Sequence, residues 1–357
     1  MAAEPYVESR TASPALPAPR GVLSAAVLSS LHRGSAPLAH PQVLTAAEPY
    51  GDDLQLALYV LYELHYQSFA GVGDDREWDP DLLRLRRDLE SRFLSALRAD
   101  VPGGADAQDA LAGILVEPGA AEGTGVSHYL QSHGRLWQMR EYAALRSLYH
   151  LKEADPHAWV IPRLYGRAKA AMVAVEYDEF GAGRAEDVHA RLFADLMDDL
   201  DLDHAYGAYL DAAPAQALCA VNLMSLFGLH RALRGALIGH FAAVEITSSP
   251  GSRRLAKAMR QTGAGPAAER FYDEHIEADA VHEQVVRHEV IGPLLAAEPH
   301  LDADVAFGVQ ATDLLEDKLG AHVLGAWTDD RSALRLPLPA TRGPAGPHAG
   351  PGTGPVS

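Results

Sequence analysis

Residues 271–282 read Phe-Tyr-Asp-Glu-His-Ile-Glu-Ala-Asp-Ala-Val-His and contain the pattern His-x3-Asp-x2-His. On an α-helix the side chains of His275, Asp279 and His282 fall at about 0°, 40° and 340° around the axis, so they share one narrow stripe. An apolar residue continues this stripe one turn before it and one turn after it. The pattern therefore predicts a helix that carries two imidazoles and a carboxylate on a face directed into the protein.

This polar stripe needs partners if it is buried. Burying two imidazoles and a carboxylate without partners costs several kcal/mol, and a divalent cation bound by all three removes that cost. The alternative is a solvated helix face, because a chain with 17 His can produce this spacing by chance. The stripe by itself indicates half of a metal site.

The composition indicates a globular chain. With 357 residues and 48% hydrophobic content, it can form one large domain or two of ordinary size. A net charge of −18 without a basic patch argues against nucleic acid and anionic membrane as partners. A single cysteine, Cys219, allows no intrachain disulfide and fits a reducing compartment. We recognise neither a secretion signal nor an apolar run long enough to span a bilayer, so the expected location is the cytoplasm.

The apolar periodicity is helical almost throughout and predicts an all-α protein. Residues 1–48 and 336–357 are rich in Ala, Pro, Ser or Gly, and we expect mostly disordered tails there. A helical extension is expected at 49–125 and a helical bundle at 126–330. Helices are predicted at about 52–70, 79–99, 135–153, 162–180, 185–199, 214–247, 252–261, 265–297 and 302–327, with Pro250-Gly251 closing the long apolar helix.

Further candidate ligands lie upstream of the polar stripe. Glu153 ends one predicted helix, and Glu179 ends the next. His189 follows Glu179 after a Gly181-Ala-Gly183 segment that can bend the backbone so that the two side chains converge. A buried Glu is also commonly satisfied by Arg or backbone donors, so neither carboxylate is a ligand by its position alone.

The six candidates together carry a family resemblance. Their order and gaps resemble those of the heme-oxygenase-like diiron oxidases and oxygenases, the iron-containing redox enzymes, over roughly residues 126–327. The resemblance implies a heme-oxygenase-like helical bundle without heme, here with an N-terminal helical extension. It also implies two Fe2+ ions as cofactors, O2 as co-substrate and often a homodimer. The metal ligands that it implies are Glu153, Glu179, His189, His275, Asp279 and His282.

A second ligand plan competes with this one. Glu186-x-x-His189 and Asp279-x-x-His282, together with Glu63 and Glu245, imitate the four-carboxylate, two-histidine plan of ferritin-like diiron proteins. That plan leaves His275 and the glycine bend unexplained. We therefore favour the first set, with Glu63 as a structural or pocket-lining residue and Glu245 as a group behind the ligands.

The function expected from the resemblance is an iron-dependent, O2-using oxidoreductase that acts on a small molecule. The reactions that the family offers are N-oxygenation, oxidative C–C cleavage or desaturation, and decarboxylation. The chain has no Gly-rich dinucleotide loop, so we expect an external electron donor. The alternatives are a non-catalytic heme-oxygenase-like protein that binds a cofactor or partner, and a ferritin-like iron-binding protein.

Overall fold

The computed structural model describes residues 13–34, 41–115 and 125–338. In these three ranges the regular structure is helical, without a β-strand, as the sequence predicted. Every helix within them is too short or too polar to cross a lipid bilayer. Of the expected tail at 336–357, residues 339–357 lie outside the described residues.

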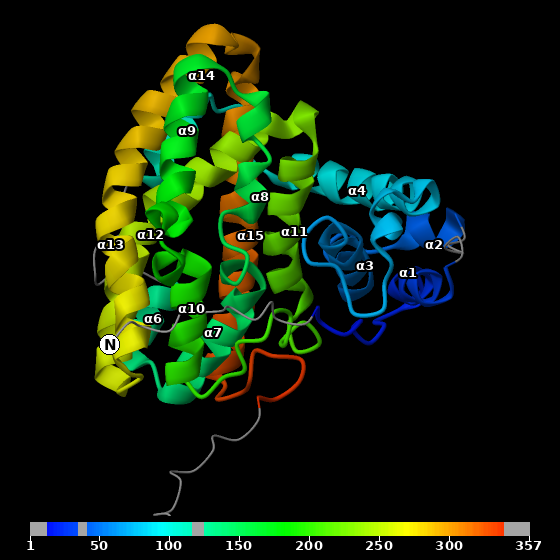
Figure 1. The fold of residues 1–357 in the computed structure, drawn as a ribbon, viewed down its shortest axis with the longest axis horizontal. Coiled ribbons are helices and arrows are strands. Elements are labelled where there is room, and N and C mark those ends of the chain that lie inside the picture. Colours follow the sequence, from blue (N-terminus) through cyan, green and yellow to red (C-terminus); the bar gives the residue numbers. More distant parts are fainter. Residues whose placement is uncertain (1–12, 35–40, 116–124, 339–357) are drawn as a thin grey trace, which may run out of the picture.

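The larger part of the molecule is a bundle of long, roughly aligned helices (Figure 1). The helix α12 packs extensively against α13 and α15, and α10 packs against α13. The helices of this part are α5 (Ala107–Ile114), α6 (Val126–His133), α7 (Leu136–His150), α8 (Asp155–Ala158), α9 (Gly166–Glu179), α10 (His189–Asp199), α11 (Ala215–Leu229), α12 (Arg234–Thr262), α13 (Pro266–Val285), α14 (Gly292–Ala297) and α15 (Asp302–Thr328).

Two glycines allow α12 and α15 to cross closely. A Cβ atom on Gly239 would lie 2.0 Å from the carbonyl oxygen of Val305, and one on Gly308 would lie 2.0 Å from that of Ala236. Real Cβ atoms do not come so close to backbone oxygens, so the two helices keep this separation only with glycine at both positions. The crossing fixes α12, which carries a carboxylate of the site described below.

The predicted helix at 214–247 is wrong in its bounds. The structure breaks this apolar segment into α11 and α12, with a short 3-10 turn, Arg231–Leu233, between them. The last carbonyl groups of α11 accept hydrogen bonds from Arg163, which provides the end of the helix with partners. Pro250 does not end α12, which continues to Thr262 because packing on α13 and α15 outweighs the one backbone hydrogen bond that proline removes.

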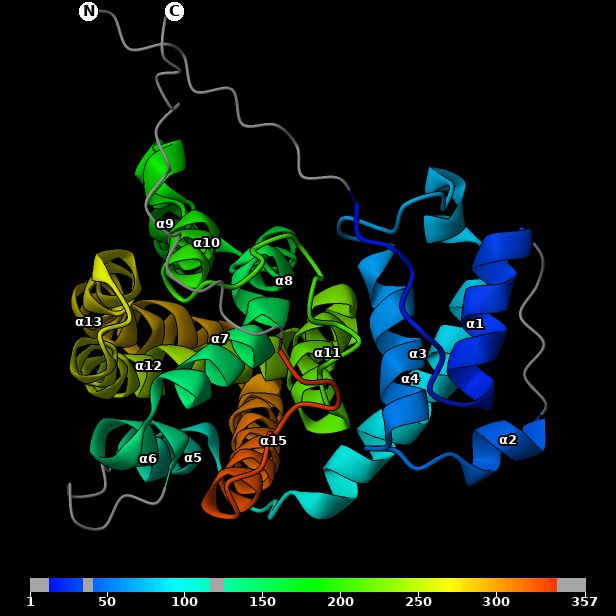
Figure 2. The same ribbon diagram turned by 90° about the horizontal axis from the view of Figure 1, so that it is seen from below.

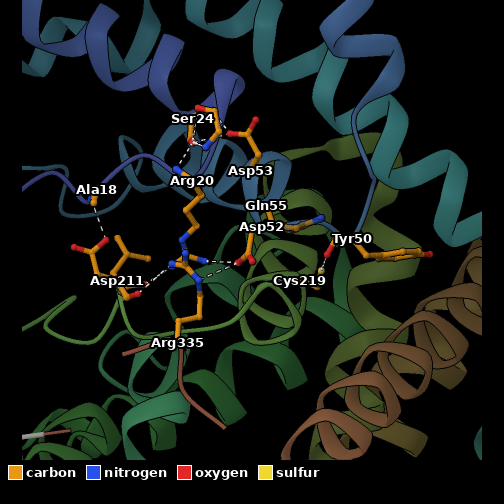
Figure 3. A network of polar contacts seen from close by, with 12 residues as sticks. Ala18, Arg20, Ser24, Tyr50, Asp52, Asp53, Gln55, Asp211, Cys219 and Arg335 are labelled. Atoms are coloured by element: carbon orange, nitrogen blue, oxygen red, sulfur yellow. Dashed lines mark hydrogen bonds and ion pairs between the residues drawn. The ribbon is translucent and has the colours of Figure 1, made fainter. Parts of the chain in front are cut away.

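The expected disorder of residues 1–48 is wrong for residues 22–33. They form α1 (Val22–Arg33), whose buried side chains include Leu23, Val27 and Leu31. The Asp53 carboxylate, at the start of α3 (Asp52–Glu63), accepts hydrogen bonds from the backbone N–H groups of residues 23 and 24 (Figure 3). A tertiary contact thus caps α1, and the local sequence does not reveal it.

The N-terminal helices lie beside the bundle. Helices α1, α3 and α4 (Pro80–Asp100) form a separate layer, with the short α2 (Pro41–Ala46) at its edge, and α3 packs against α11 (Figure 2). At this interface the Asn222 amide donates to the backbone oxygen and to the side-chain oxygen of Gln55, both at 2.8 Å. Close by, Arg20 pairs with Asp52 at 3.0 Å and donates to the Leu210 carbonyl at 2.6 Å (Figure 3).

Candidate metal centre

The polar stripe of the sequence lies on α13 and faces the interior. His275, Asp279 and His282 are 5%, 2% and 2% exposed. The Nδ1 atom of His275 lies 2.7 Å from the carbonyl oxygen of Phe271. Because a carbonyl oxygen only accepts, Nδ1 carries the proton of the neutral imidazole, and Nε2 is the nitrogen that can supply a lone pair to a ligand. That Nε2 atom is buried without a hydrogen-bond partner, which leaves it available to a metal ion.

A first group of three potential ligand side chains forms around His275. The potential ligand atoms of Glu153, His189 and His275 all lie within 4.8 Å of one another. Glu153 stands in the turn after α7, where its Oε1 accepts a hydrogen bond from His150 Nδ1 at 2.8 Å. Its other oxygen, Oε2, lies 3.8 Å from His275 Nε2 and has no hydrogen-bond partner. One oxygen of Glu153 is thus held in place and the other is left for a ligand.

A second group of four side chains adjoins the first. Potential ligand atoms of Glu179, Glu245, Asp279 and His282 also lie within 4.8 Å of one another. His282 Nδ1 stands at their centre, 3.3 Å from Glu179 Oε1, 3.2 Å from Glu245 Oε2 and 3.8 Å from Asp279 Oδ1. Three carboxyl groups thus surround one imidazole in a buried site.

The glycine segment after α9 joins the two groups. Gly181 and Gly183 have φ of 72° and 84°, the left-handed region that favours glycine, and they turn the chain from Glu179 back to His189 at the start of α10. Glu179 Oε2 and His189 Nδ1 come within 2.7 Å, although His189 Nδ1 has no partner with hydrogen-bond geometry. The His189 and His275 rings are 4.5 Å apart between centroids. Glu179 therefore lies between the two groups.

The charges of the site depend on one another. Burial alone would raise the pKa of Glu179, but the nearby His189 and His282 lower it to about 2. Burial alone would lower the pKa of His275, but Glu153 raises it to about 10. In the same way Glu179 and Glu245 outweigh burial and raise the pKa of His282 to about 11. Protons on the imidazoles thus take the place of a cation and balance the buried carboxylates.

The residues fit a pair of divalent cations. Glu153 Oε2, His189 Nδ1, His275 Nε2 and Asp279 Oδ2 are buried without hydrogen-bond partners, which is costly unless a ligand satisfies them. The four carboxylates of the two groups carry the charge that two divalent cations balance. A cavity of about 20 Å³ lies between the groups and is lined by members of both. Carboxylate oxygens with imidazole nitrogens are ligands that suit iron or manganese.

All six candidate ligands of the sequence analysis lie in these two groups, whereas Glu63 and Glu186 of the rival plan do not. Glu186 is exposed in the turn before α10, and Glu63 lies in a different cluster, where it accepts a hydrogen bond from Lys152. Glu245, which we expected behind the ligands, belongs to the second group. Residues 235–246 of α12 are buried almost throughout, so no polar stripe in the local pattern marks it.

The sequence analysis overlooked Glu176. It stands one turn before Glu179 on α9, is 2% exposed, and neither carboxylate oxygen has a hydrogen-bond partner. Burial and the charges of Glu179 and Glu245 raise its pKa to about 9, so it is a neutral acid at pH 7. The spacing of three from Glu179 is the one signal that could have marked it.

A larger cavity reaches the first group. Its volume is about 700 Å³, it lies between α7, α11, α12, α13 and α15, and His150 and His275 are among its lining residues. Most of the wall is apolar, with side chains such as Leu145, Met224 and Phe271. Arg146 spans part of it and donates to both carboxylate oxygens of Glu316, at 2.8 and 2.6 Å. Such a space can hold a small organic molecule beside the metal-ligand groups.

Comparison with known proteins agrees with this geometry. Residues 140–317 match the family model described as iron-containing redox enzyme. The matched range contains both ligand groups in full. No curated protein sequence matches the chain. Through its residues 140–317, a heme-oxygenase-like helical bundle with a buried cluster of His and carboxylate side chains, the chain belongs to the iron-containing redox enzyme family.

Proposed function

We propose that the protein is a non-heme diiron oxidase or oxygenase that uses O2 to oxidise a small molecule. The observation that carries the proposal is the pair of adjoining buried groups, Glu153 with His189 and His275, and Glu179 with Glu245, Asp279 and His282. A heme would need a single axial imidazole and would give no role to four buried carboxylates. The proposal therefore assigns one Fe2+ ion to each group, with Glu179 between them.

The protein residues have distinct tasks in this proposal. His275 presents Nε2 because Phe271 holds the proton on Nδ1, and His150 orients Glu153. The packing of Phe193 on Phe271, with ring centroids 5.0 Å apart, adds an apolar wall beside His150 and the first group. Two iron ions, when bound, would supply the redox chemistry that activates O2.

The substrate of the proposed enzyme binds in the 700 Å³ cavity. Its apolar wall accepts the body of a small molecule, and the proximity of His275 brings the bound molecule to the first metal group. The reaction is one of N-oxygenation, oxidative C–C cleavage or desaturation, and decarboxylation. Electrons come from an external donor, and a homodimer is the expected assembly.

A test of this function starts with metal binding. Metal-free protein is titrated with Fe2+ without oxygen, and the expected result is two ions bound per chain. Exposure of the loaded protein to O2 should then consume the gas and oxidise the iron. Binding of less than one ion per chain would reject the proposal and favour a non-catalytic heme-oxygenase-like binding protein. Uptake of many ions per chain would favour a ferritin-like iron-binding protein.

A further inference from the structure

A buried ion pair lies next to Glu153 in the sequence. Lys152 precedes Glu153 in the turn after α7, and its Nζ donates to Oε2 of Glu63, the last residue of α3, at 2.9 Å. Lys152 is 2% exposed and Glu63 is 1% exposed. A buried charge without its partner is strongly unfavourable, so each residue constrains the other. The pair joins the N-terminal helical layer to the turn that carries a candidate ligand.

Neighbouring tyrosine side chains hold both members of this ion pair in place. Tyr206 Oη donates to Glu63 Oε1 at 2.6 Å, so the second carboxylate oxygen is also held. The ammonium of Lys152 lies 4.3 Å from the ring centroid of Tyr66 and 5.1 Å from that of Tyr59. Aromatic faces attract a cation at such distances. The end of the Lys152 side chain is therefore enclosed by groups from α3 and from the segment that follows it.

The backbone of the turn depends on such constraints. Ala154, directly after Glu153, has φ of 72° and is 1% exposed. A non-glycine residue adopts this left-handed conformation only where the surrounding structure imposes it. The Lys152 side chain, anchored on Glu63, holds one side of the turn, and the hydrogen bond from Asp155 N to Lys152 O, at 3.2 Å, closes it. Glu153 lies between Lys152 and Asp155, so these contacts constrain its backbone.

We propose that Glu63 and Lys152 are positioning residues of the metal centre, through which the N-terminal helices hold Glu153 at the first metal group. Glu63 lies outside the range 140–317 that matches the family model, so the matched range alone does not contain everything that shapes this group. The inference rests on the proposed function, because it requires that the two groups bind metal ions.

The experiment is an anaerobic Fe2+ titration of the full chain. The double variant Glu63→Leu, Lys152→Met removes both charges, and replacing a buried pair by apolar residues is often neutral for stability. Loss of a group that orients a ligand typically weakens metal affinity about 10- to 100-fold. We expect that loss for one of the two ions, the same ion that Glu153→Gln loses, with parental affinity for the other. Thermal unfolding followed by circular dichroism checks the fold.

The matched control is Glu141→Gln. Glu141 is another buried carboxylate, on α7 itself, and it accepts hydrogen bonds from Trp327 Nε1 and Ala333 N, both at 2.9 Å. The Glu141→Gln variant should bind both ions with the affinity of the parent protein. A folded double variant that binds both ions with parental affinity would overturn the inference.

A second variant covers the case in which the double variant does not fold. Glu63→Asp keeps the charge and shortens its reach, so selective weakening of the same ion supports the inference and unchanged affinity overturns it. A parent protein that fails to bind two ions would instead reject the proposed function.

Discussion

Glu245 Oε2 lies 3.2 Å from His282 Nδ1, although the two residues stand on different helices, α12 and α13. Burial, opposed by His282 and reinforced by Asp279 and Glu179, raises the pKa of Glu245 to about 8. In the metal-free protein at pH 7 this carboxyl group is therefore mostly protonated. A bound cation would favour its ionised form, so Glu245 can change from a neutral neighbour to a ligand when metal binds.

Replacing Glu245 by Gln is expected to weaken binding of the second ion by about 10- to 100-fold and to leave the first ion in place. The amide keeps the shape of the side chain but cannot supply a negative oxygen. Competition with a metal-sensitive indicator under anaerobic conditions measures both affinities. Glu176→Gln is the matched control, because Glu176 is already neutral at pH 7 and lies outside both ligand groups. Equal losses in the two variants would contradict a special role for Glu245.

Metal uptake is expected to strengthen as the pH rises. In the metal-free protein His275 and His282 have pKa values raised to about 10 and 11, so both are protonated at neutral pH. Ligation requires neutral imidazoles, and each bound ion must therefore expel a proton. Between pH 6.5 and 7.5 the affinity should rise by at least about tenfold. Proton release into a weakly buffered anaerobic solution during Fe2+ addition provides the direct measurement, and its absence would count against these protonation states.

The same pKa shifts make the stability of the metal-free protein depend on pH. Because the folded pKa values of His275 and His282 lie above the unfolded ones, their stabilising contribution is complete below about pH 6.5 and is lost as the pH rises through 10 and 11. Glu179 acts in the opposite direction, since its contribution is present above about pH 4.5 and is lost as the pH falls through 2. Thermal unfolding of chelator-treated protein should therefore show a midpoint that falls between pH 7 and pH 10.

The local sequence is enough to predict the helices and most of the site. The parts that it does not predict depend on tertiary contacts. His275, Asp279 and His282 lie on one face because their spacing is helical, and the glycines after Glu179 mark the bend that brings His189 back. Glu245 carries no such mark, because its membership depends on how α12 crosses α13. Helix α1 was missed for a similar reason, since its cap comes from Asp53 on another helix.

The crossing of α12 and α15 gives a prediction about stability. Gly239→Ala places a Cβ against the Val305 carbonyl, which cannot move without its helix, so the free energy of unfolding should fall by about 1–3 kcal/mol. Gly251→Ala is the control on the same helix, because nothing lies within 4 Å of its Cβ. There the gain in helix propensity should stabilise the protein by up to about 1 kcal/mol. Urea unfolding of both variants measures the difference, and a loss of similar size at both positions would contradict the close crossing.

The Asp279→Ala variant is expected to fold like the parent protein and to lose its metal-dependent activity. Asp279 lies between the two imidazoles of the polar stripe, is 2% exposed, and its Oδ2 has no hydrogen-bond partner. Burial raises its pKa, with Glu179 adding to that effect and His275 and His282 opposing it. Removing a group that is costly to bury leaves the apolar packing of α13 intact, so the variant should unfold within a few degrees of the parent.

The metal content of the Asp279→Ala variant is expected to change strongly. The second group loses a carboxylate that contributes to its charge balance, so iron content should fall and O2 consumption should be abolished. Glu277→Ala is the matched control, since Glu277 is an exposed carboxylate on the same helix that belongs to neither group. An Asp279→Ala protein that takes up iron and consumes O2 like the parent would remove Asp279 from the metal centre and, with it, the argument that the stripe on α13 exists to bind metal.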